Sequence, residues 1–320
     1  MRHNKQLSPE EREKIKVYLE QGLSLAKIGD KISRDKSVIS RELSRNTDEN
    51  GEYVACNAQK KAEQRKKHCG AKRKLENAEA REYVAEKLEK AHWSPEQIAE
   101  RAKLEKKPFS LCYSTIYRGI DSGVLPKATK ENIPVKRKYK SRKAVDNRGQ
   151  IPNRVNIRQR PKEVEKRSTP GHWESDTVLG KRGTGCIGTH VERKSGFLIA
   201  FYLADKQSGC FTNATIDAFK TVPDKLKKSF TVDNGKEFAC HETLSEKTGM
   251  GVYFCDPYSF WQRGTNENTN GLLRRFFPKK TSFANISTED VNRVVSLINN
   301  RPRKRLGFRT PYEILQKYHT

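Results

Sequence analysis

Apolar residues at helical spacing predict three short helices near the start of the chain. The segment 8–22 begins with serine and proline, which is a typical helix start, carries one apolar face and ends at a glycine. A shorter helix over 25–32 follows, and a tight turn leads to a third helix over 36–46, in which Ile39 and Leu43 face inward. Two helices joined by a tight turn are typical of a helix-turn-helix module, whose second helix enters the major groove of DNA.

The same start signal recurs at Ser94, where WSPEQIAERAK predicts another helix. After a loop, the segment 110–120 supplies a second helix, with Ile116 and Tyr117 expected to face inward and Arg118 outward. This pattern indicates a second helix-turn-helix-like module. A purely packing role for these two helices is the alternative.

Strand-like and helix-like runs alternate in the second half of the chain. Three short β-rich segments come first, and an α/β alternation then leads to an amphipathic helix around 288–300. This order predicts a mixed five-stranded sheet with helices packed on it, and therefore an α+β multidomain chain with an all-α front. The expected strands are HWESDTVLG, GCIGTHVER, GFLIAFYLA, SFTVDNG and GVYFCD.

The charge of the chain is strongly basic and unevenly distributed. Its 65 Lys and Arg against 39 Asp and Glu give a formal net charge of +26. Residues 101–170 alone hold 20 basic against 6 acidic residues, a net charge of +14. A cationic excess of this size favours a polyanionic partner, and nucleic acid is the first candidate. The segment 124–168 reads as a basic linker that contacts DNA phosphates, although a merely solvated tether would look similar.

Other classes of protein are disfavoured by what the sequence lacks. No apolar stretch approaches the roughly 20 residues that a membrane-spanning helix needs, and the first residues lack an apolar signal segment. The seven cysteines are scattered without a Cys-x-x-Cys pair, which argues against a disulfide framework or a zinc site. We therefore expect a protein of a reducing cytosol.

Small hydroxyl side chains alternate with arginine on the polar face of the third helix. Serine can donate to bases or phosphates and arginine can read guanine edges, so this face suits the major groove. A small three-helix bundle with a solvated polar face is the alternative. With the second module and the linker included, the candidate DNA-contacting residues are Ser37, Ser40, Arg41, Ser44, Arg45, Arg118, Lys136, Arg137 and Lys138.

Three acids stand where the predicted sheet would gather them. Asp176 lies inside the first strand, Asp233 closes the strand SFTV, and Glu267 begins a helix. Taken singly, each is more often a solvated charge, a turn former or a helix-start acid, and other acids such as Glu174 and Glu237 are alternatives. If the three converge without a compensating cluster of cations, divalent metal is the natural counter-charge. Two such ions can activate an attacking oxygen and stabilise a leaving 3′-oxygen.

The spacing of the acids and the residues around them carry a family resemblance. Thirty-three residues separate Asp233 from Glu267, and the runs TVDNGKEF and CDPYSFWQRGTNENTNGLLRRFFPK surround them. Together with HWESDTV, SRELSRN, WSPEQIA and NNRPRKRLGFRTPYE, they closely resemble the DDE transposases of bacterial insertion sequences. The group most similar is the one typified by insertion sequence thirty. The likeness covers nearly the whole chain, and Ser175 is a local departure from an expected glycine.

The resemblance implies a ribonuclease-H-like catalytic domain with Asp176, Asp233 and Glu267 as the metal-binding catalytic triad. It implies Mg²⁺ as the cofactor, with two ions expected and Mn²⁺ able to substitute. Arg274 matches a basic position near the DNA phosphates. The implied activity is binding of transposon ends, followed by strand cleavage and transfer into target DNA. Double-stranded DNA is then the partner, the chain forms a homodimer or larger assembly, and it acts in the bacterial cytoplasm on the nucleoid.

Two other functions remain as alternatives: a DNA-binding regulator that keeps the catalytic fold without chemistry, and a nuclease of RNA–DNA hybrids that shares the fold. The expected organisation is a helix-turn-helix module over 1–50, a basic helical connector over 51–92, a second module over 93–123, a linker over 124–168 and the catalytic domain over 169–320.

Overall fold

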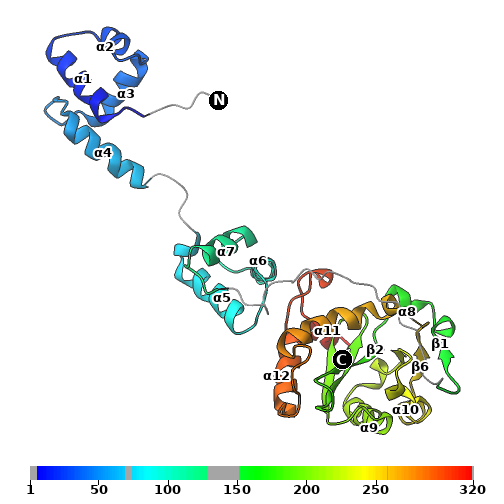
Figure 1. Cartoon of the computed structure of the whole chain (residues 1–320). Coiled ribbons are helices and arrows are strands. Elements are labelled where there is room, and N and C mark those ends of the chain that lie inside the picture. Colours follow the sequence, from blue (N-terminus) through cyan, green and yellow to red (C-terminus); the bar gives the residue numbers. More distant parts are fainter. Residues whose placement is uncertain (1–5, 69–73, 128–150, 258, 319–320) are drawn as a thin grey trace. The chain divides into compact units, whose positions relative to one another are not determined.

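The computed structural model describes residues 6–68, 74–127, 151–257 and 259–318 of the 320-residue chain. The chain divides into two compact units, Met1–Lys72 and Arg73–Thr320 (Figure 1). Within the described ranges, no helix is long and apolar enough to cross a membrane.

The first unit is helical. Buried Ile15, Ile28 and Ile39 come from three different helices and meet in one core. The expected capping box is present, since the Ser8 side chain accepts from the backbone of Glu11 and the Glu11 side chain accepts from the backbone of Ser8. The helices described in this unit are α1 (Pro9–Glu20), α2 (Leu25–Lys31), α3 (Lys36–Asn46) and α4 (Ala55–His68).

A buried ion pair joins the helices of this unit. Arg12 on α1 donates to the Glu42 carboxylate on α3, with Nε 2.7 Å from Oε1. The same guanidinium donates to the Leu7 carbonyl and to the Gln59 side chain on α4, and the Tyr53 hydroxyl donates to Glu42. These contacts fix α3 against its neighbours, so its outer face is held in a defined position.

The second unit begins with another helical module. Its helices are α5 (Ala78–Glu89), α6 (Pro95–Leu104) and α7 (Tyr113–Asp121), and the capping box expected at Ser94 is present. Ile116 is buried as expected, but Tyr117 is 37% exposed, so its inward placement was wrong. The reason is that Gly119 lies against Leu75 and Leu125, which turns the face containing 116 and 119 inward and leaves 117 outside.

The sheet of the second unit has six strands in the order β1-β6-β5-β2-β3-β4. The strands β2, β3 and β4 are antiparallel neighbours, whereas β5 pairs parallel to both β2 and β6. The α+β multidomain class with a mixed sheet is confirmed. The strands are β1 (Val155–Asn156), β2 (His172–Leu179), β3 (Cys186–Glu192), β4 (Leu198–Leu203), β5 (Ser229–Val232) and β6 (Gly251–Phe254).

The sixth strand differs from the expectation of five. Strand β1 lies inside the segment 124–168 that we expected to be a linker, and it pairs parallel to β6. Two residues are too few to show a period along the sequence, and their partner is about 100 residues away. The expected DNA contacts Lys136, Arg137 and Lys138 lie outside the described residues.

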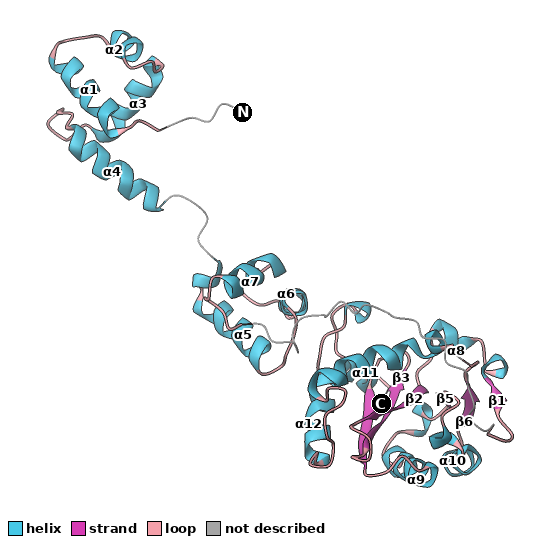
Figure 2. Cartoon of the chain, in the orientation of Figure 1, coloured by secondary structure: helices cyan, strands magenta, loops and turns pink. Residues whose placement is uncertain are grey.

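Helices cover both faces of the sheet (Figure 2). One core contains Trp173 and Phe230 of the sheet with Phe211 of α9 (Ser208–Phe219) and Leu244 of α10 (His241–Thr248). The core on the other face contains sheet residues such as Ile187, packed against apolar side chains of α11 (Gly264–Phe276) and α12 (Thr288–Asn299). Two short helices, α8 (Glu163–Lys166) and α13 (Pro311–Gln316), complete the unit.

Residues near the C-terminus contact the second helical module. Arg101 on α6 pairs with Glu313 on α13, with Nη2 2.5 Å from Oε1. Gln97, also on α6, donates to the Pro302 carbonyl at 2.8 Å. These contacts join the module to the segment that follows α12.

Candidate active site

Two neighbouring parallel strands bring Asp176 and Asp233 together. Glu174 of β2 lies opposite Thr231 of β5 in the sheet register, so two residues further along Asp176 lies beside Asp233. Asp233 directly follows the last residue of β5, where the chain leaves the sheet. The placement of both aspartates therefore follows from the pairing of β2 and β5.

The guanidinium group of Arg263 lies between the two carboxylates. Its Nη2 is 2.8 Å from Oδ2 of Asp233, and its Nη1 is 3.4 Å from Oδ1 of Asp176 and 2.8 Å from the Ser175 carbonyl oxygen. Sequence reasoning missed this cation. The signal that could have found it is the position of Arg263 at the end of the short 3-10 helix Phe260–Arg263, directly before α11, the helix that carries Glu267.

Hydrogen bonds fix the orientation of both aspartates. The Thr177 amide donates to Oδ1 of Asp176 and the Asn270 side chain donates to Oδ2, each at 2.9 Å. The Gly235 amide donates to Oδ1 of Asp233, also at 2.9 Å. Each carboxylate therefore presents its oxygens in a defined direction, which is what a cation site requires.

Desolvation dominates the electrostatics of Asp176. Burial raises the pKa of this carboxyl above its ordinary value, the neighbouring Asp233 raises it further, and Arg263 opposes both effects. A carboxyl in this environment gains from an added positive charge.

The helix α11 is held on the sheet by a buried acid. Glu174 is fully buried, and its Oε2 accepts the Asn266 amide at 2.7 Å while its Oε1 pairs with Arg193 at 2.6 Å. Asn266 also donates to the Glu174 main-chain carbonyl at 2.8 Å. The contacts of Glu174 with Asn266 and of Asp176 with Asn270 have matching spacings. The two acids lie two residues apart on the strand, and the two asparagines lie four residues apart on the helix.

Glu267 lies on α11 between these two asparagines and is exposed. The expected side of the helix does face the aspartates, because Asn270 contacts Asp176. Among the residues that the structure describes, however, no group of three His, Cys, Asp or Glu side chains is arranged to hold a metal ion. The structure therefore brings two of the three predicted acids together. Arg274, on the same side of α11, donates to the Leu179 carbonyl at 2.8 Å.

A further buried acid, Glu237, lies close to the pair. Its Oε1 accepts from the Thr177 hydroxyl at 2.8 Å and pairs with Lys206 at 2.9 Å. Its Oε2 is buried without a hydrogen-bond partner in the described part of the chain. Gly235 makes room for it, since a Cβ at that position would lie 2.3 Å from this oxygen and 2.9 Å from Asp233.

The predicted DNA-contacting residues of the first unit share one exposed surface of α3. Arg41 is held over the start of the helix, with Nε donating to the Ser37 carbonyl at 3.0 Å and Nη2 to the Ser37 hydroxyl at 3.2 Å. In the second module, Arg118 is exposed on α7 and donates to the Ser114 carbonyl at 3.4 Å. The exposed residues of the α3 surface are Ser37, Ser40, Arg41, Ser44 and Arg45.

Two parts of the chain match known protein families. Residues 3–46 match the helix-turn-helix domain, and residues 166–259 match the integrase core domain. The first match contains helices α1 to α3. The second contains Asp176 and Asp233 and ends before Glu267.

The chain is also similar to curated proteins along almost its whole length. It is 38% identical over 322 residues to the transposase InsI for insertion sequence element IS30C of Escherichia coli K12, an alignment that covers 97% of this chain and 83% of that protein. The transposase for insertion sequence element IS1086 of Cupriavidus metallidurans is 34% identical, with 97% and 94% covered. The transposase for insertion sequence element IS4351 of Bacteroides fragilis is 37% identical, with 97% and 95% covered.

A helix-turn-helix domain followed by an integrase core defines a class of DNA-recombining enzymes that transfer polynucleotide strands. Integrase cores generally use divalent metal ions. Within that class, the chain belongs to the IS30 family of insertion-sequence transposases.

Proposed function

We propose that this transposase binds the terminal inverted repeats of its insertion sequence and cleaves and joins DNA strands with Asp176, Asp233 and Glu267 as its catalytic acids. The observation that carries the proposal is the pair of carboxylates on neighbouring strands with a cation between them. Two acids held this close need positive charge, and the integrase core to which they belong acts on polynucleotides.

The donor set fits divalent magnesium, with manganese as a substitute. Carboxylate oxygens are hard ligands of the type that Mg²⁺ prefers, and both aspartates are only partly buried. Two bound ions would favour deprotonation of an attacking water or 3′-hydroxyl and stabilise the departing 3′-oxygen. In the structure the Arg263 guanidinium pairs with both carboxylates, so a divalent ion would compete with it for the same oxygens. Glu267, exposed on the helix beside them, is the third acid in the proposal.

The chain's own groups orient the reaction. Thr177 and Asn270 fix the plane of the Asp176 carboxylate, and Gly235 fixes that of Asp233. Glu174 holds the start of α11, and with it the position of Glu267 relative to the sheet. An in-line displacement needs this pre-organisation because its reacting oxygens must be aligned.

The first unit supplies sequence recognition in the proposal. Its helix α3 presents serine hydroxyls and arginine on an exposed surface of the size and polarity that enters the major groove. Arg118 in the second module and Arg274 beside the catalytic acids are further candidate contacts to double-stranded DNA. Because two transposon ends must be brought together, we propose that two or more copies of the chain assemble on them.

The test is strand cleavage and joining on duplexes that carry the transposon end, with Mg²⁺, by the full chain and by Asp233→Asn. We expect the substitution to abolish both reactions, because Asn cannot supply a charged oxygen to a cation. Asp217→Asn, a change of the same kind on the exposed surface of α9, is the matched control and should retain activity. Cleavage by Asp233→Asn at the wild-type rate would overturn the assignment.

A further inference from the structure

A basic pocket lies against α11 on a different side from the two aspartates. Its volume is about 280 Å³. It is lined on the helix by residues 264, 265, 268 and 269, whereas Asn270 and Arg274 lie on the side that faces β2. We call it the arginine pocket; its lining is Arg167, Gly196, Gly264, Thr265, Asn268, Thr269, Arg303, Lys304 and Arg305.

The lining carries four basic side chains and no acid. In the described part of the chain, Lys304 pairs with Glu96 at 2.7 Å, but no carboxylate forms an ion pair with Arg167, Arg303 or Arg305. Arg305 donates to the Lys194 carbonyl at 2.9 Å and Arg303 to the Ile298 carbonyl at 3.4 Å, and both of these acceptors are neutral. Three of the four basic side chains therefore carry charge that no ion pair among the described residues compensates.

The arginines also repel one another. Burial, together with the charges of Arg305 and Arg275, lowers the pKa of Arg303 to about 10. Burial likewise lowers the pKa of Arg305, and Arg167 adds to that effect. Glu192 and, to a smaller extent, Glu174 oppose this effect on Arg305. The Glu192 carboxylate already accepts from the Lys194 and Ser195 amides, and the Glu174 carboxylate already binds Arg193 and the Asn266 amide. A cluster of this kind gains from an added anion.

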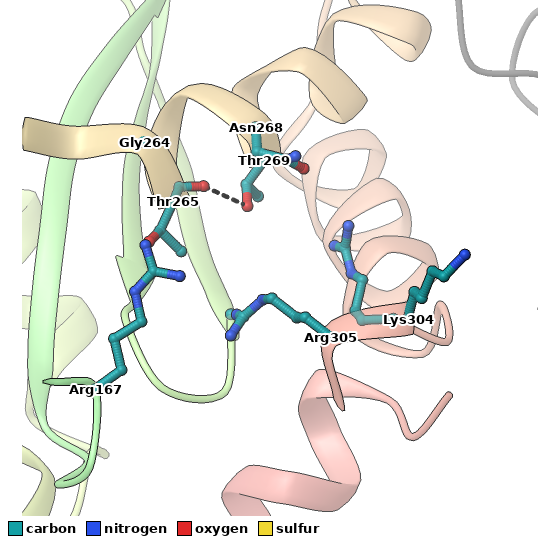
Figure 3. Close-up of a pocket in the computed structure, with 9 residues that line it drawn as sticks. Arg167, Gly264, Thr265, Asn268, Thr269, Lys304 and Arg305 are labelled. Carbon is teal, nitrogen blue, oxygen red and sulfur yellow. Dashed lines mark hydrogen bonds between the residues drawn. The ribbon is translucent and has the colours of Figure 1, made fainter. Parts of the chain in front are cut away.

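A second observation on the same pocket points to a ligand. Thr265 is only 7% exposed, and its hydroxyl is buried without a hydrogen-bond partner among the described residues. This hydroxyl belongs to the first turn of α11, a helix of 13 residues whose start favours anions. Figure 3 shows the side chains of Arg167 and Arg305 directed toward it from two sides. At Gly264, a side chain would meet nothing within 4 Å, so the approach to the helix start is open.

We propose that the arginine pocket binds a phosphodiester group of the DNA backbone. Arg167 and Arg305 supply the charge, and the Thr265 hydroxyl donates to a phosphate oxygen. The proposal rests on the proposed function, because it is DNA bound by the transposase that reaches the pocket. The helix that carries Glu267 would then contact DNA on a second side, which fixes it during strand transfer.

Equilibrium binding of duplex DNA to the full chain without divalent metal tests this proposal. We expect Arg167→Gln and Arg305→Gln each to weaken binding by roughly five- to tenfold. Each should also reduce the slope of log affinity against log salt concentration by about one. Arg293→Gln, the same change on the exposed surface of α12, is the control and should leave both quantities unchanged. Equal slopes and affinities for Arg167→Gln, Arg305→Gln and Arg293→Gln would overturn the proposal.

A third variant separates binding from folding. Thr265→Val keeps the shape of the side chain and removes a hydroxyl that has no internal partner among the described residues. It should therefore leave the melting temperature unchanged or raised while it weakens DNA binding by roughly twofold to fivefold. Unchanged DNA affinity in this variant would contradict the role given to the hydroxyl.

Two further measurements identify the source of the phosphate that the pocket binds. Transposon-end duplexes and scrambled duplexes should lose affinity equally, because a backbone contact carries no sequence information. Inorganic phosphate should raise the melting temperature of the wild-type chain more than that of Arg167→Gln. If it does so while Arg167→Gln binds DNA as wild type does, the pocket takes free phosphate and the proposal fails. Because no cleavage is measured, failure here is distinct from loss of strand transfer, which tests the proposed function.

Discussion

The aspartate pair, which is negative, and the arginine pocket, which is positive, lie against different sides of α11. Asp176 and Asp233 have their counter-charge inside the protein, in Arg263. Arg167, Arg303 and Arg305 have no carboxylate partner in the described residues. Under the two proposals, the first site exchanges an internal cation for a metal cation, and the second is neutralised by a ligand from outside.

The largest effect on stability should come from weakening the contacts that hold α11 on the sheet, because both clusters lie against this helix. Glu174→Gln removes the buried partner of Arg193 and weakens the hold on Asn266, so we expect a loss of about 3 kcal/mol in the free energy of unfolding. The rate of strand cleavage should fall, and the slope of log DNA affinity against log salt concentration should become smaller. Chemical denaturation of the full chain measures the first effect. Glu246→Gln, on the exposed surface of α10, is the control.

If Glu174→Gln leaves stability unchanged, the buried contact does not hold α11. If it lowers stability but impairs only one of the two activities, the helix does not couple the clusters.

A comparison of Arg41 with Arg167 distinguishes a contact to a base from a contact to a phosphate. Arg41→Ala should weaken binding to transposon ends by about 1–3 kcal/mol and should hardly affect scrambled duplexes, because it removes a contact to a base edge. Arg167→Gln should weaken binding to both duplexes alike. Competition binding with the two duplexes measures the difference. An equal loss on both for Arg41→Ala would make Arg41 a phosphate contact instead.

A substitution of Arg263 tests whether its guanidinium compensates the charge of Asp176 and Asp233. Arg263→Gln leaves two neighbouring carboxylates without a cation, so we expect a loss of about 1–3 kcal/mol in stability in the absence of divalent ions. Mg²⁺ should raise the melting temperature of this variant more than that of wild type, since competition by the guanidinium is gone. The control is Arg158→Gln, which alters an exposed arginine paired with Asp256 at 3.6 Å. An Mg²⁺ response equal to that of wild type would contradict competition at these oxygens.

The last effect depends on pH and concerns a buried group that carries no charge. His190 is fully buried among phenylalanine rings and hydrogen-bonds with Ser175 at 2.7 Å, and burial lowers its pKa to about 3. Between the unfolded pKa near 6.5 and about pH 3, the unfolded chain binds a proton that the folded chain does not. This stabilisation is therefore complete above pH 6.5 and declines by about 1.4 kcal/mol per pH unit on acidification.

Denaturation of His190→Gln at several pH values checks this expectation. The variant should be less stable than wild type at neutral pH, and the difference should shrink as the pH falls. A difference that stays constant from pH 7 to pH 4.5 would show that His190 does not contribute to acid sensitivity.

Local signals in the sequence predicted local structure well. Ser8 with Glu11 and Ser94 with Gln97 form the capping boxes expected at the starts of α1 and α6, and the β-rich segments around 172–179 and 198–203 form strands as predicted. The sequence predicted Asp176 inside one strand and Asp233 at the end of another, and the parallel pairing of β2 with β5 brings the two side by side. The helix-turn-helix class was predictable from the pattern of two helices joined by a tight turn, and the integrase-type core was predictable from the resemblance of the motifs around the acids to a known family.

Features made by distant segments were not predictable. Strand β1 depends on pairing with β6 about 100 residues away. The arginine pocket combines Arg167 with Arg303 and Arg305, whose separation in the sequence gives no signal. Arg263 lies near Glu267 in the sequence, but only the fold shows that its guanidinium reaches the aspartates. The sequence argument named metal as the counter-charge for acids without a cluster of cations, and it did not identify Arg263 as a cation beside two of them.

Titration of Mn²⁺ into the full chain bound to transposon-end DNA, followed by calorimetry, tests the central claim most directly. Wild type should bind the ion, and Asp176→Asn should lose most of that affinity, while DNA affinity measured without metal should stay the same. Equal Mn²⁺ binding by wild type and Asp176→Asn would contradict the assignment of this carboxylate pair as the metal site of the transposase.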